Sequence, residues 1–313
     1  MKAIILNNSG TIAEFAMTEL PMPIIMENEV LIQVKTIGLN PVDVKTRSGL
    51  ALYERLKENK PLILGWDVSG VVVETGAKVS EFKKGDEVFG MVNFPGHGKC
   101  YAEYVAAPAN HIALKPSNVS HEDAAAASLA ALTAWQLLKH KAKPKPGDKI
   151  LVQAASGGVG HYAVQMAKHF GAYVIGTSSS KNRDFIISLG ADEHIAYDEQ
   201  AFENIVKDVD FVLEPFAKDN LYKSLKVTKP GGIILCIIGI IPDDVLQKAK
   251  AKDVEIFYYL VKSDGEDMKD IADLLAKGII KSHVSKVFPF EQMGNAHLEI
   301  EKGRTLGKIV VRV

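Results

Sequence analysis

One segment limits the possible folds of this chain more than any other, the stretch ILVQAASGGVGHYAVQMAKHFGA at residues 150–172. An apolar run that ends at Ala154 predicts a buried strand, and apolar residues at helical spacing predict a helix that begins near Gly158. Between them, residues 155–160 align with the pattern G-x-G-x-x-G, with alanine in place of the first glycine. A strand, a glycine turn and a helix in this order predict βαβ units and a parallel sheet.

The glycine turn is suited to binding a diphosphate. A helix N-terminus presents unpaired N–H groups and the positive end of the helix dipole, so a phosphate binds there without a lysine. Gly157 allows a phosphate to approach the backbone, and Gly160 allows the helix to pack closely on the strand. We therefore expect a dinucleotide at Ala155, Ser156, Gly157, Gly158 and Val159. The alternative is a tight βα turn with a purely structural role.

The residues after the next strand, AYVIGT, indicate which dinucleotide binds. About 20 residues past the turn, an acidic residue would bind the adenine ribose of NAD, but this chain has Ser178 there. Ser179, Lys181 and Arg183 follow, and they supply a hydroxyl donor and two cations that suit a 2'-phosphate. The sequence therefore predicts NADPH rather than NADH. The alternative is that Lys181 and Arg183 form the solvated first turn of the next helix.

The chain is long enough for two domains, because 313 residues are about twice the length of a typical domain. Residues 30–115 alternate apolar and polar positions in short runs, which indicates a compact domain of mainly antiparallel strands. From Ser120, the segment SHEDAAAASLAALTAWQLLKHK predicts one long, capped helix. Six strands are expected after it, with helices between the first five: 149–154, 173–177, 194–196, 210–213, 232–237 and 254–258.

The C-terminal tail has a different pattern. After Ser263 come a helix, a strand, a second helix and a last strand, which lack the βαβ rhythm and are expected to rejoin the first domain. The predicted fold class is therefore α/β, with a β-rich domain made of residues 1–121 and 264–313 and a doubly wound parallel-sheet domain made of residues 122–263.

Composition excludes several classes of partner. A formal net charge of -1 with 7% aromatic residues lacks the basic stripe that nucleic-acid binding needs. The longest mostly apolar run, residues 233–241, is about half of the roughly 20 residues that a membrane helix needs. The first ten residues, MKAIILNNSG, show no secretory signal. We expect a cytoplasmic protein with no membrane or nucleic-acid partner.

Further motifs occur in a fixed order: GLNPVDVKTRSG (38–49), LGWDVSGVVVETG (64–76), KKGDEVFG (83–90), CYAEYVAAP (100–108) and AAASLAALTAWQLL (125–138). Together with the glycine turn, the chain resembles the medium-chain dehydrogenase/reductase superfamily, and within it the zinc-free quinone oxidoreductases. The resemblance implies a GroES-like catalytic domain, a Rossmann domain that binds NADP, and an active site in the cleft between them. It also implies a homodimer in which late strands of the sheet pair across a two-fold axis.

The resemblance argues against a metal. The superfamily's alcohol dehydrogenases use a Cys and a His as zinc ligands at the positions of Asn40 and Trp66, and an indole cannot bind zinc. Cys100 and Cys236 are too far apart for a paired-cysteine site and are expected to be isolated, buried thiols. Without a Lewis acid, an acceptor whose conjugation spreads the developing negative charge is favoured.

The resemblance also implies contacts with the nicotinamide end of the coenzyme. Asn40 and Thr133 are implied beside the nicotinamide, with Ile238 and Lys308 close to it. Tyr197, by contrast, is implied near the adenosine phosphate.

The acceptor side of the site is less defined. Tyr53 is the candidate proton donor, with Asn40 as the other catalytic candidate, and solvent is the alternative source of the proton. Asp43 is expected to hold the turn at Asn40. Residues 50–60 and the loop VNFPGHGK, residues 92–99, are expected to shape the acceptor pocket.

These features predict an enzyme that reduces a quinone or an α,β-unsaturated carbonyl by hydride transfer from NADPH, without zinc. A 2-alkenal or enone reductase is the alternative within the same class. A module that senses NADPH without turnover is the alternative outside it, because the sequence contains no obligate catalytic side chain. Both reductase hypotheses imply a small-molecule acceptor as the partner of this protein.

Overall fold

The structure is a computed structural model that describes residues 1–216, 219–237 and 239–313. These residues form two compact units, the first made of residues 1–132 and 261–313 and the second of residues 133–260. The sequence assigns residues 122–132 to the second domain. In the structure they belong to the first unit, because α3 (His121–Ala126) packs on β3 (Glu29–Leu39) and β4 (Asp67–Thr75). The functional domain borders at 121 and 264 remain predictions.

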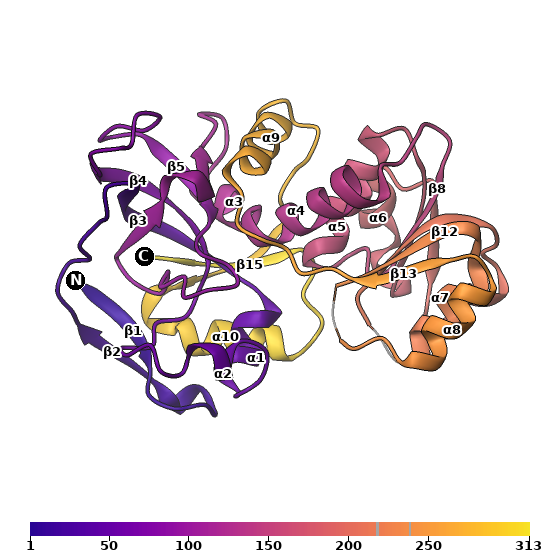
Figure 1. The fold of residues 1–313 in the computed structure, drawn as a ribbon, viewed down its shortest axis with the longest axis horizontal. Coiled ribbons are helices and arrows are strands. Elements are labelled where there is room, and N and C mark those ends of the chain that lie inside the picture. Colours follow the sequence, from indigo (N-terminus) through magenta and orange to yellow (C-terminus); the bar gives the residue numbers. More distant parts are fainter. Residues whose placement is uncertain (217–218, 238) are drawn as a thin grey trace. The chain divides into compact units, whose positions relative to one another are not determined.

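The second unit is built on a six-stranded parallel sheet (Figure 1). Its strand order is β10-β9-β8-β11-β12-β13, and this is the order of a doubly wound fold, whose switch point lies between β8 and β11. The six strands confirm the predicted set. They are β8 (Lys149–Val152), β9 (Tyr173–Ser178), β10 (Glu193–Ala196), β11 (Val209–Glu214), β12 (Thr228–Cys236) and β13 (Glu255–Tyr258).

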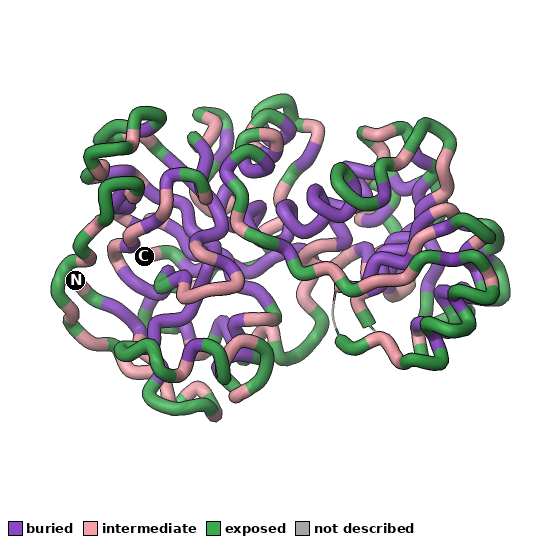
Figure 2. The backbone as a smooth tube through the Cα atoms, in the orientation of Figure 1, coloured by how far each residue is buried: buried purple, intermediate pink, exposed green. Residues whose placement is uncertain are grey.

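Helices cover both faces of this sheet. Figure 1 shows α5 (Gly158–His169) and α6 (Arg183–Ser188) on one side, and α7 (Asp219–Val227) and α8 (Asp243–Ala251) on the other. The strands between them are largely buried and supply much of the core of the second unit (Figure 2). A helix was also expected between β10 and β11, but that connection forms only a 3-10 turn, Phe202–Asn204. This single turn is enough to bury Phe202 and, just after it, Val206 in the core.

The first unit contains a seven-stranded sheet with the order β14-β15-β3-β4-β5-β7, in which β6 also pairs with β3. Its pairs are antiparallel except for β14 with β15, so the prediction of a mainly antiparallel domain is confirmed. A separate two-stranded sheet joins β1 (Lys2–Leu6) to β2 (Phe15–Glu19). The other strands are β5 (Glu87–Met91), β6 (Tyr104–Pro108), β7 (Ile112–Leu114), β14 (Val284–Pro289) and β15 (Lys308–Arg312).

The C-terminal tail joins the first unit, as predicted. It forms α9 (Gly265–Ala276), β14, α10 (Met293–Glu301) and β15. The tail nevertheless contains one βαβ unit, because β14 and β15 are parallel and α10 connects them. A single such unit leaves no repeating rhythm in the sequence, and β15 completes its pairing by running antiparallel to β3.

The long helix predicted from Ser120 is interrupted. The cap is confirmed, since the Ser120 hydroxyl accepts the backbone N–H of Asp123 at 3.0 Å. However, α3 ends at Ala126, α4 covers Ser128–Trp135, and a π-helical segment follows at Gln136–Ala142. At the first break the backbone N–H of Leu129 donates to the Asp67 carboxylate at 2.9 Å. A side-chain acceptor inserted at a helix break is a known cause of such interruptions.

Two further expectations concern single residues and membrane spans. Cys100 and Cys236 are both buried free thiols, as predicted, and burial raises the pKa of Cys236 to about 12. Within the described ranges, no helix combines the length and the apolar composition of a membrane span.

Candidate functional site

The glycine turn lies at the switch point of the second unit's sheet, between the end of β8 at Val152 and the start of α5 at Gly158. Ala154 takes a left-handed conformation with φ of 49°, and the backbone N–H of Ala155 donates to Thr177 at 2.9 Å. In this turn, the residue with the left-handed backbone conformation is thus Ala154 and not Ala155. This explains why alanine is accepted where the fingerprint has its first glycine.

The two remaining glycines of the fingerprint have different surroundings. A Cβ on Gly160 would lie 2.2 Å from the carbonyl oxygen of Ala154, so the close packing predicted for Gly160 is confirmed. A Cβ on Gly157 would meet only that same oxygen, at 3.2 Å. The space beside Gly157 is therefore open apart from one contact, which leaves room for a ligand.

The head of α5 can receive an anion. The helix has 12 residues, and its first turn contains no acidic side chain. Its N-cap is Gly157, which has no side chain that would occupy the free N–H groups. A diphosphate at this end therefore meets unpaired N–H donors and no competing carboxylate.

Asn182 connects the turn to the residues predicted to bind the 2'-phosphate. Its side-chain amide donates to the Ser156 hydroxyl at 3.1 Å. Asn182 lies between Lys181 and Arg183, so the two predicted anion-binding segments are brought together by one hydrogen bond. The sequence analysis did not single out Asn182, although an amide between two cations at the end of a strand is a recognisable signal.

The hydroxyl of Ser178 is buried and already bonded. It lies 2.8 Å from Nε2 of His194, and it donates to the Ser179 carbonyl at 3.1 Å. Burial lowers the pKa of His194. A contact between Ser178 and a 2'-phosphate therefore stays a prediction, and Ser179, which is half-buried, is the more accessible hydroxyl. Tyr197 is 64% exposed, and its backbone N–H donates to the Ser178 carbonyl at 3.0 Å.

A carboxylate that the sequence analysis missed also lies here. The Asp198 carboxylate accepts the backbone N–H of Ser180 at 2.8 Å and the Ser180 hydroxyl at 3.0 Å. These donors, the backbone N–H first, hold the pKa of Asp198 below its usual value. Lys181 and Arg183 are exposed, and neither forms a hydrogen bond or ion pair with another described residue. The segment therefore offers two unpaired cations beside one bonded carboxylate.

Glu214 fixes the other side of the switch point. It ends β11, and it is fully buried. Its Oε2 accepts hydrogen bonds from Gln153 at 2.8 Å, Asn220 at 2.8 Å and Ser224 at 2.6 Å. Gln153 directly precedes the glycine turn, so this network ties the ends of β8 and β11 together.

In the first unit, the Asn40 amide is held between two opposite charges. Its Nδ2 donates to the Asp67 carboxylate at 2.8 Å, and its Oδ1 accepts from the Lys308 ammonium. Lys308 also donates to the Leu39 carbonyl at 2.7 Å. Because Asn40, Asp67 and Lys308 are all nearly fully buried, the charges on either side fix which way the amide faces.

Two buried carboxyls surround this amide. The Asp43 carboxylate accepts the backbone N–H of Asn40 at 2.7 Å, which confirms its predicted structural role at the start of α1 (Pro41–Arg47). Burial, and next the charge of Asp67, raises the pKa of Asp43 to about 7. Burial raises the pKa of Asp67 to about 6, against the opposing effect of Lys308. The Tyr101 hydroxyl, which is also fully buried in the first unit, lies 2.9 Å from Nε2 of His297.

The other candidates lie at separate places. Tyr53 begins the short helix α2 (Tyr53–Leu56) within the expected loop, and its hydroxyl accepts the backbone N–H of Ser9 at 3.2 Å. Thr133 is buried in α4. Ile238 lies outside the described residues. The roles of Tyr53, Thr133, Ile238 and Lys308 stay predictions.

Asn40 and Trp66 stand where the superfamily's alcohol dehydrogenases have zinc ligands. The Asn40 amide is bonded as described above, and the Trp66 indole donates to the Gly96 carbonyl at 2.7 Å. Across the described residues, no group of three or more His, Cys, Asp or Glu side chains is placed to hold a metal ion.

Comparisons with known proteins place this geometry in a family. A family model described as an alcohol dehydrogenase GroES-like domain matches residues 26–117, and one described as a zinc-binding dehydrogenase matches residues 189–311. The chain is 36% identical over 299 residues to 2-methylene-furan-3-one reductase of Solanum lycopersicum, covering 93% of this chain and 73% of that protein.

Solved structures give the same result. The quinone oxidoreductase from Coxiella burnetii has a TM-score of 0.93 at 36% identity, over 100% of this chain and 99% of that chain. The Escherichia coli quinone oxidoreductase complexed with NADPH has a TM-score of 0.90 at 26% identity, over 100% of both chains. The fold is thus a GroES-like domain with a Rossmann domain, as predicted. The chain belongs to the zinc-free quinone oxidoreductase group of the medium-chain dehydrogenase/reductase superfamily.

Proposed function

We propose that this protein reduces a quinone or an α,β-unsaturated carbonyl with NADPH as the hydride donor. The observation that carries the proposal is the open, acid-free head of α5 beside Gly157, linked through Asn182 to two unpaired cations. The names of the relatives agree, since they include a furanone reductase, a quinone oxidoreductase and a structure with NADPH.

The residues of the second unit fit the coenzyme. The N–H groups at the start of α5 would hold its diphosphate, and Lys181 and Arg183 would hold its 2'-phosphate. When bound, NADPH supplies the hydride, which is the demanding part of the chemistry. The protein supplies binding and orientation.

The residues in the first unit favour a conjugated acceptor. Positions 40 and 66 hold an amide and an indole, which are poor ligands for a Lewis-acidic metal. Conjugation in a quinone or enone spreads the charge that develops after hydride addition, so hydrogen bonds and one proton suffice. The proton comes from Tyr53 or from solvent. The Tyr53 hydroxyl accepts a hydrogen bond from Ser9 and keeps its own proton available for donation.

Stopped-flow oxidation of NADPH tests the proposal. We expect saturable oxidation, followed at 340 nm, with 1,4-naphthoquinone and with a small enal as acceptors. Faster turnover of the quinone supports a quinone reductase, and faster turnover of the enal supports the alkenal or enone reductase. Saturable NADPH binding with no acceptor reduced above background would contradict both and support a sensing module.

A homodimer is part of the proposal. The support is β13, an edge strand of the second unit's sheet, with Tyr258 46% exposed and Ile256 only partly buried. An exposed edge of this kind can pair with a second copy. Light scattering should give twice the 34.1 kDa chain mass, and Tyr258→Lys should shift the protein toward the monomer. A monomer at all concentrations would contradict this part.

A cytoplasmic location is also part of the proposal. Its support is the pair of buried, unpaired thiols Cys100 and Cys236, which is typical of proteins from a reducing compartment. Cell fractionation of the tagged full-length protein tests it, and recovery with the membrane or secreted fraction would contradict it.

A further inference from the structure

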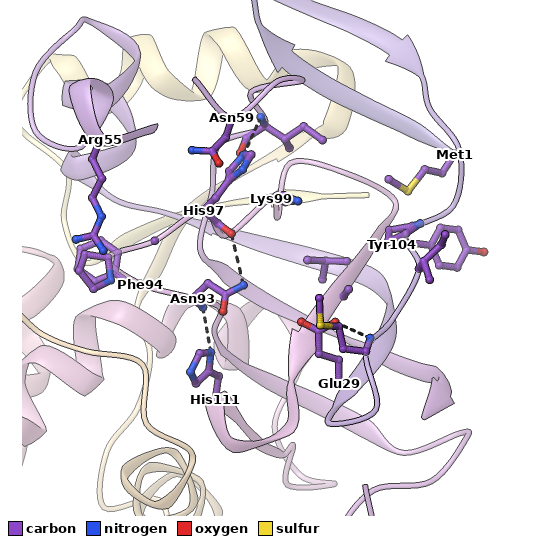
Figure 3. A pocket seen from close by; sticks show the side chains of 18 residues that line it. Met1, Glu29, Arg55, Asn59, Asn93, Phe94, His97, Lys99, Tyr104 and His111 are labelled. Carbon is purple, nitrogen blue, oxygen red and sulfur yellow. Dashed lines mark hydrogen bonds between the residues drawn. The ribbon is translucent and has the colours of Figure 1, made fainter. Parts of the chain in front are cut away.

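A pocket of about 650 Å³ lies in the first unit (Figure 3). Arg55 and Asn59 line one side of it, the loop from Asn93 to Lys99 lines its middle, and Tyr104 lies on the opposite side. Pockets for small organic ligands have about 300–1,000 Å³. The two segments that the sequence assigns to the acceptor pocket, 50–60 and 92–99, therefore border one cavity of suitable size.

Two cations of this pocket have no partner. Neither Arg55 nor Lys99 forms a hydrogen bond or an ion pair with any other residue in the described part of the chain. Glu29 also lines the pocket, but its carboxylate accepts the backbone N–H of Met26 at 2.9 Å. Since the whole chain has a formal net charge of -1, the positive charge here is a local feature.

The two histidines of the pocket add no charge at neutral pH. Burial first, and then the charge of Lys99, lowers the pKa of His97 to about 4. Burial lowers the pKa of His111, whose Nδ1 accepts the backbone N–H of Asn93 at 3.2 Å. Met1 also lines the pocket, and its N-terminal ammonium donates to the Leu20 carbonyl at 2.7 Å. Arg55 and Lys99 are therefore the two side-chain cations that an anion in the pocket can meet without displacing a partner.

The pocket also has apolar walls. Phe94 lines it and packs edge-on against Trp66, with ring centroids 5.4 Å apart. Ile63 and Val105 add aliphatic surface. A flat ring system can cover these side chains while a charged substituent reaches a cation.

We infer that this pocket binds the electron acceptor and selects acceptors that carry an anionic group, which Arg55 and Lys99 recognise. The inference rests on the proposed function, because it takes the ligand of the pocket to be the acceptor. In the reaction, the quinone takes up a hydride from NADPH and one proton from Tyr53 or solvent, and the hydroquinone and NADP⁺ result.

Two matched acceptors test the inference, the neutral 1,4-naphthoquinone and the anionic 1,4-naphthoquinone-2-sulfonate. For each acceptor, kcat/KM of a variant is divided by that of the unchanged protein, so the different reduction potentials of the two quinones cancel. We expect Lys99→Gln and Arg55→Gln each to lower this ratio about 5-fold or more for the sulfonate. The ratio for the neutral quinone should fall clearly less than the ratio for the sulfonate, because the neutral ring loses no charge–charge contact.

The control variant is Lys57→Gln. It removes one positive charge from the same segment, but Lys57 does not line the pocket and pairs with Glu54 at 2.6 Å on the surface. If Lys57→Gln lowered kcat/KM for the sulfonate as much as Lys99→Gln does, the effect would come from long-range attraction by the surface charge. That result would overturn the inference. If Lys99→Gln and Arg55→Gln lowered kcat/KM equally for both acceptors, or for neither acceptor, the inference would be overturned as well.

A binding measurement separates failure of the inference from failure of the proposed function. Calorimetry with 2-naphthalenesulfonate, which cannot be reduced, should show binding that Lys99→Gln weakens by a similar factor. If the unchanged protein reduces neutral quinone but binds this anion no better than Lys99→Gln does, only the inference is wrong. If it binds the anion but reduces no acceptor, the pocket takes a ligand that is not an acceptor, and both fail.

Discussion

The Asn40 amide donates to the Asp67 carboxylate at 2.8 Å, and both side chains are nearly fully buried. Lys308 lies on the other side of the amide and 3.8 Å from the same carboxylate. The charge of Asp67, in an interior that disfavours it, is therefore stabilised by one cation, by the Asn40 amide and by the backbone N–H of Leu129.

Removing that cation should be costly. We expect Lys308→Met to lower the free energy of unfolding by about 3–5 kcal/mol, because it leaves a buried carboxylate without its counter-charge. The double variant Lys308→Met with Asp67→Asn should recover part of this loss. Urea unfolding measures both. A double variant no more stable than Lys308→Met alone would show that the cost comes from lost packing rather than from charge.

Asp43 should make the stability depend on pH. Its pKa is raised to about 7 in the folded protein from an ordinary value of 3.8, so the folded state holds a proton that the unfolded chain releases. The contribution of Asp43 is therefore most favourable below about pH 4 and is lost as the pH rises toward 7. His297, whose pKa is lowered to about 3, acts in the opposite direction and loses stability as the pH falls below about 6.5.

Asp43→Asn isolates this effect, because its amide oxygen can still accept from the Asn40 backbone. We expect the fall in Tm between pH 5 and pH 7.5 to be smaller in this variant than in the unchanged protein. The exposed Asp243→Asn serves as the control and should keep the original slope. The same slope in all three proteins would contradict the raised pKa of Asp43.

The choice of coenzyme should depend on the two unpaired cations. Lys181→Gln and Arg183→Gln should each raise KM for NADPH about 10-fold, since one charge-assisted contact with a phosphate is lost. KM for NADH should stay nearly unchanged. The exposed Lys207→Gln, which changes the charge elsewhere in the second unit, is the control. If KM rose equally for NADPH and NADH in these variants, Lys181 and Arg183 would not form a 2'-phosphate site.

Asp198→Asn should act in the other direction. The carboxylate accepts two hydrogen bonds from Ser180, and its charge opposes a phosphate beside it. We expect KM for NADPH to fall a few-fold and KM for NADH to change little, as measured in the same initial-rate assay. An increase in KM for NADPH would indicate that the order of the Ser180 turn matters more than the charge.

The two glycines of the turn should separate stability from binding. Gly160→Ala places a methyl group 2.2 Å from the Ala154 carbonyl oxygen and should cost about 3 kcal/mol of unfolding free energy. Gly157→Ala should change stability by less than about 1 kcal/mol, while the Kd for NADPH rises about 10-fold because the methyl group narrows the open space. Denaturant unfolding and fluorescence titration give the two readouts. Equal stability losses for both would contradict the geometry.

Much of the fold follows from local patterns. The six strands of the second unit, the cap at Ser120 and the packing role of Gly160 depend on periodicity or on neighbouring residues, which the sequence displays directly. The alternation of strands and helices also fixes the parallel sheet.

The features that were missed depend on residues far apart in the chain. The break between α3 and α4 involves Asp67, which lies 62 residues before Leu129. The orientation of the Asn40 amide depends on a hydrogen bond from Lys308, which belongs to the last strand. Ser178 is bonded to His194 on the next strand, which no local pattern indicates. Such pairings arise only when the sheet has formed.

The hydrogen bond from Asn182 to Ser156 has one more consequence. It joins the loop at the adenosine end to the loop at the diphosphate end before any coenzyme arrives. When the coenzyme binds, it still loses translational and rotational entropy. The two loops lose little conformational entropy, because this hydrogen bond already holds them together. Coenzyme capture should consequently be less sensitive to temperature-driven loosening of these loops than it would be if each had to be ordered separately.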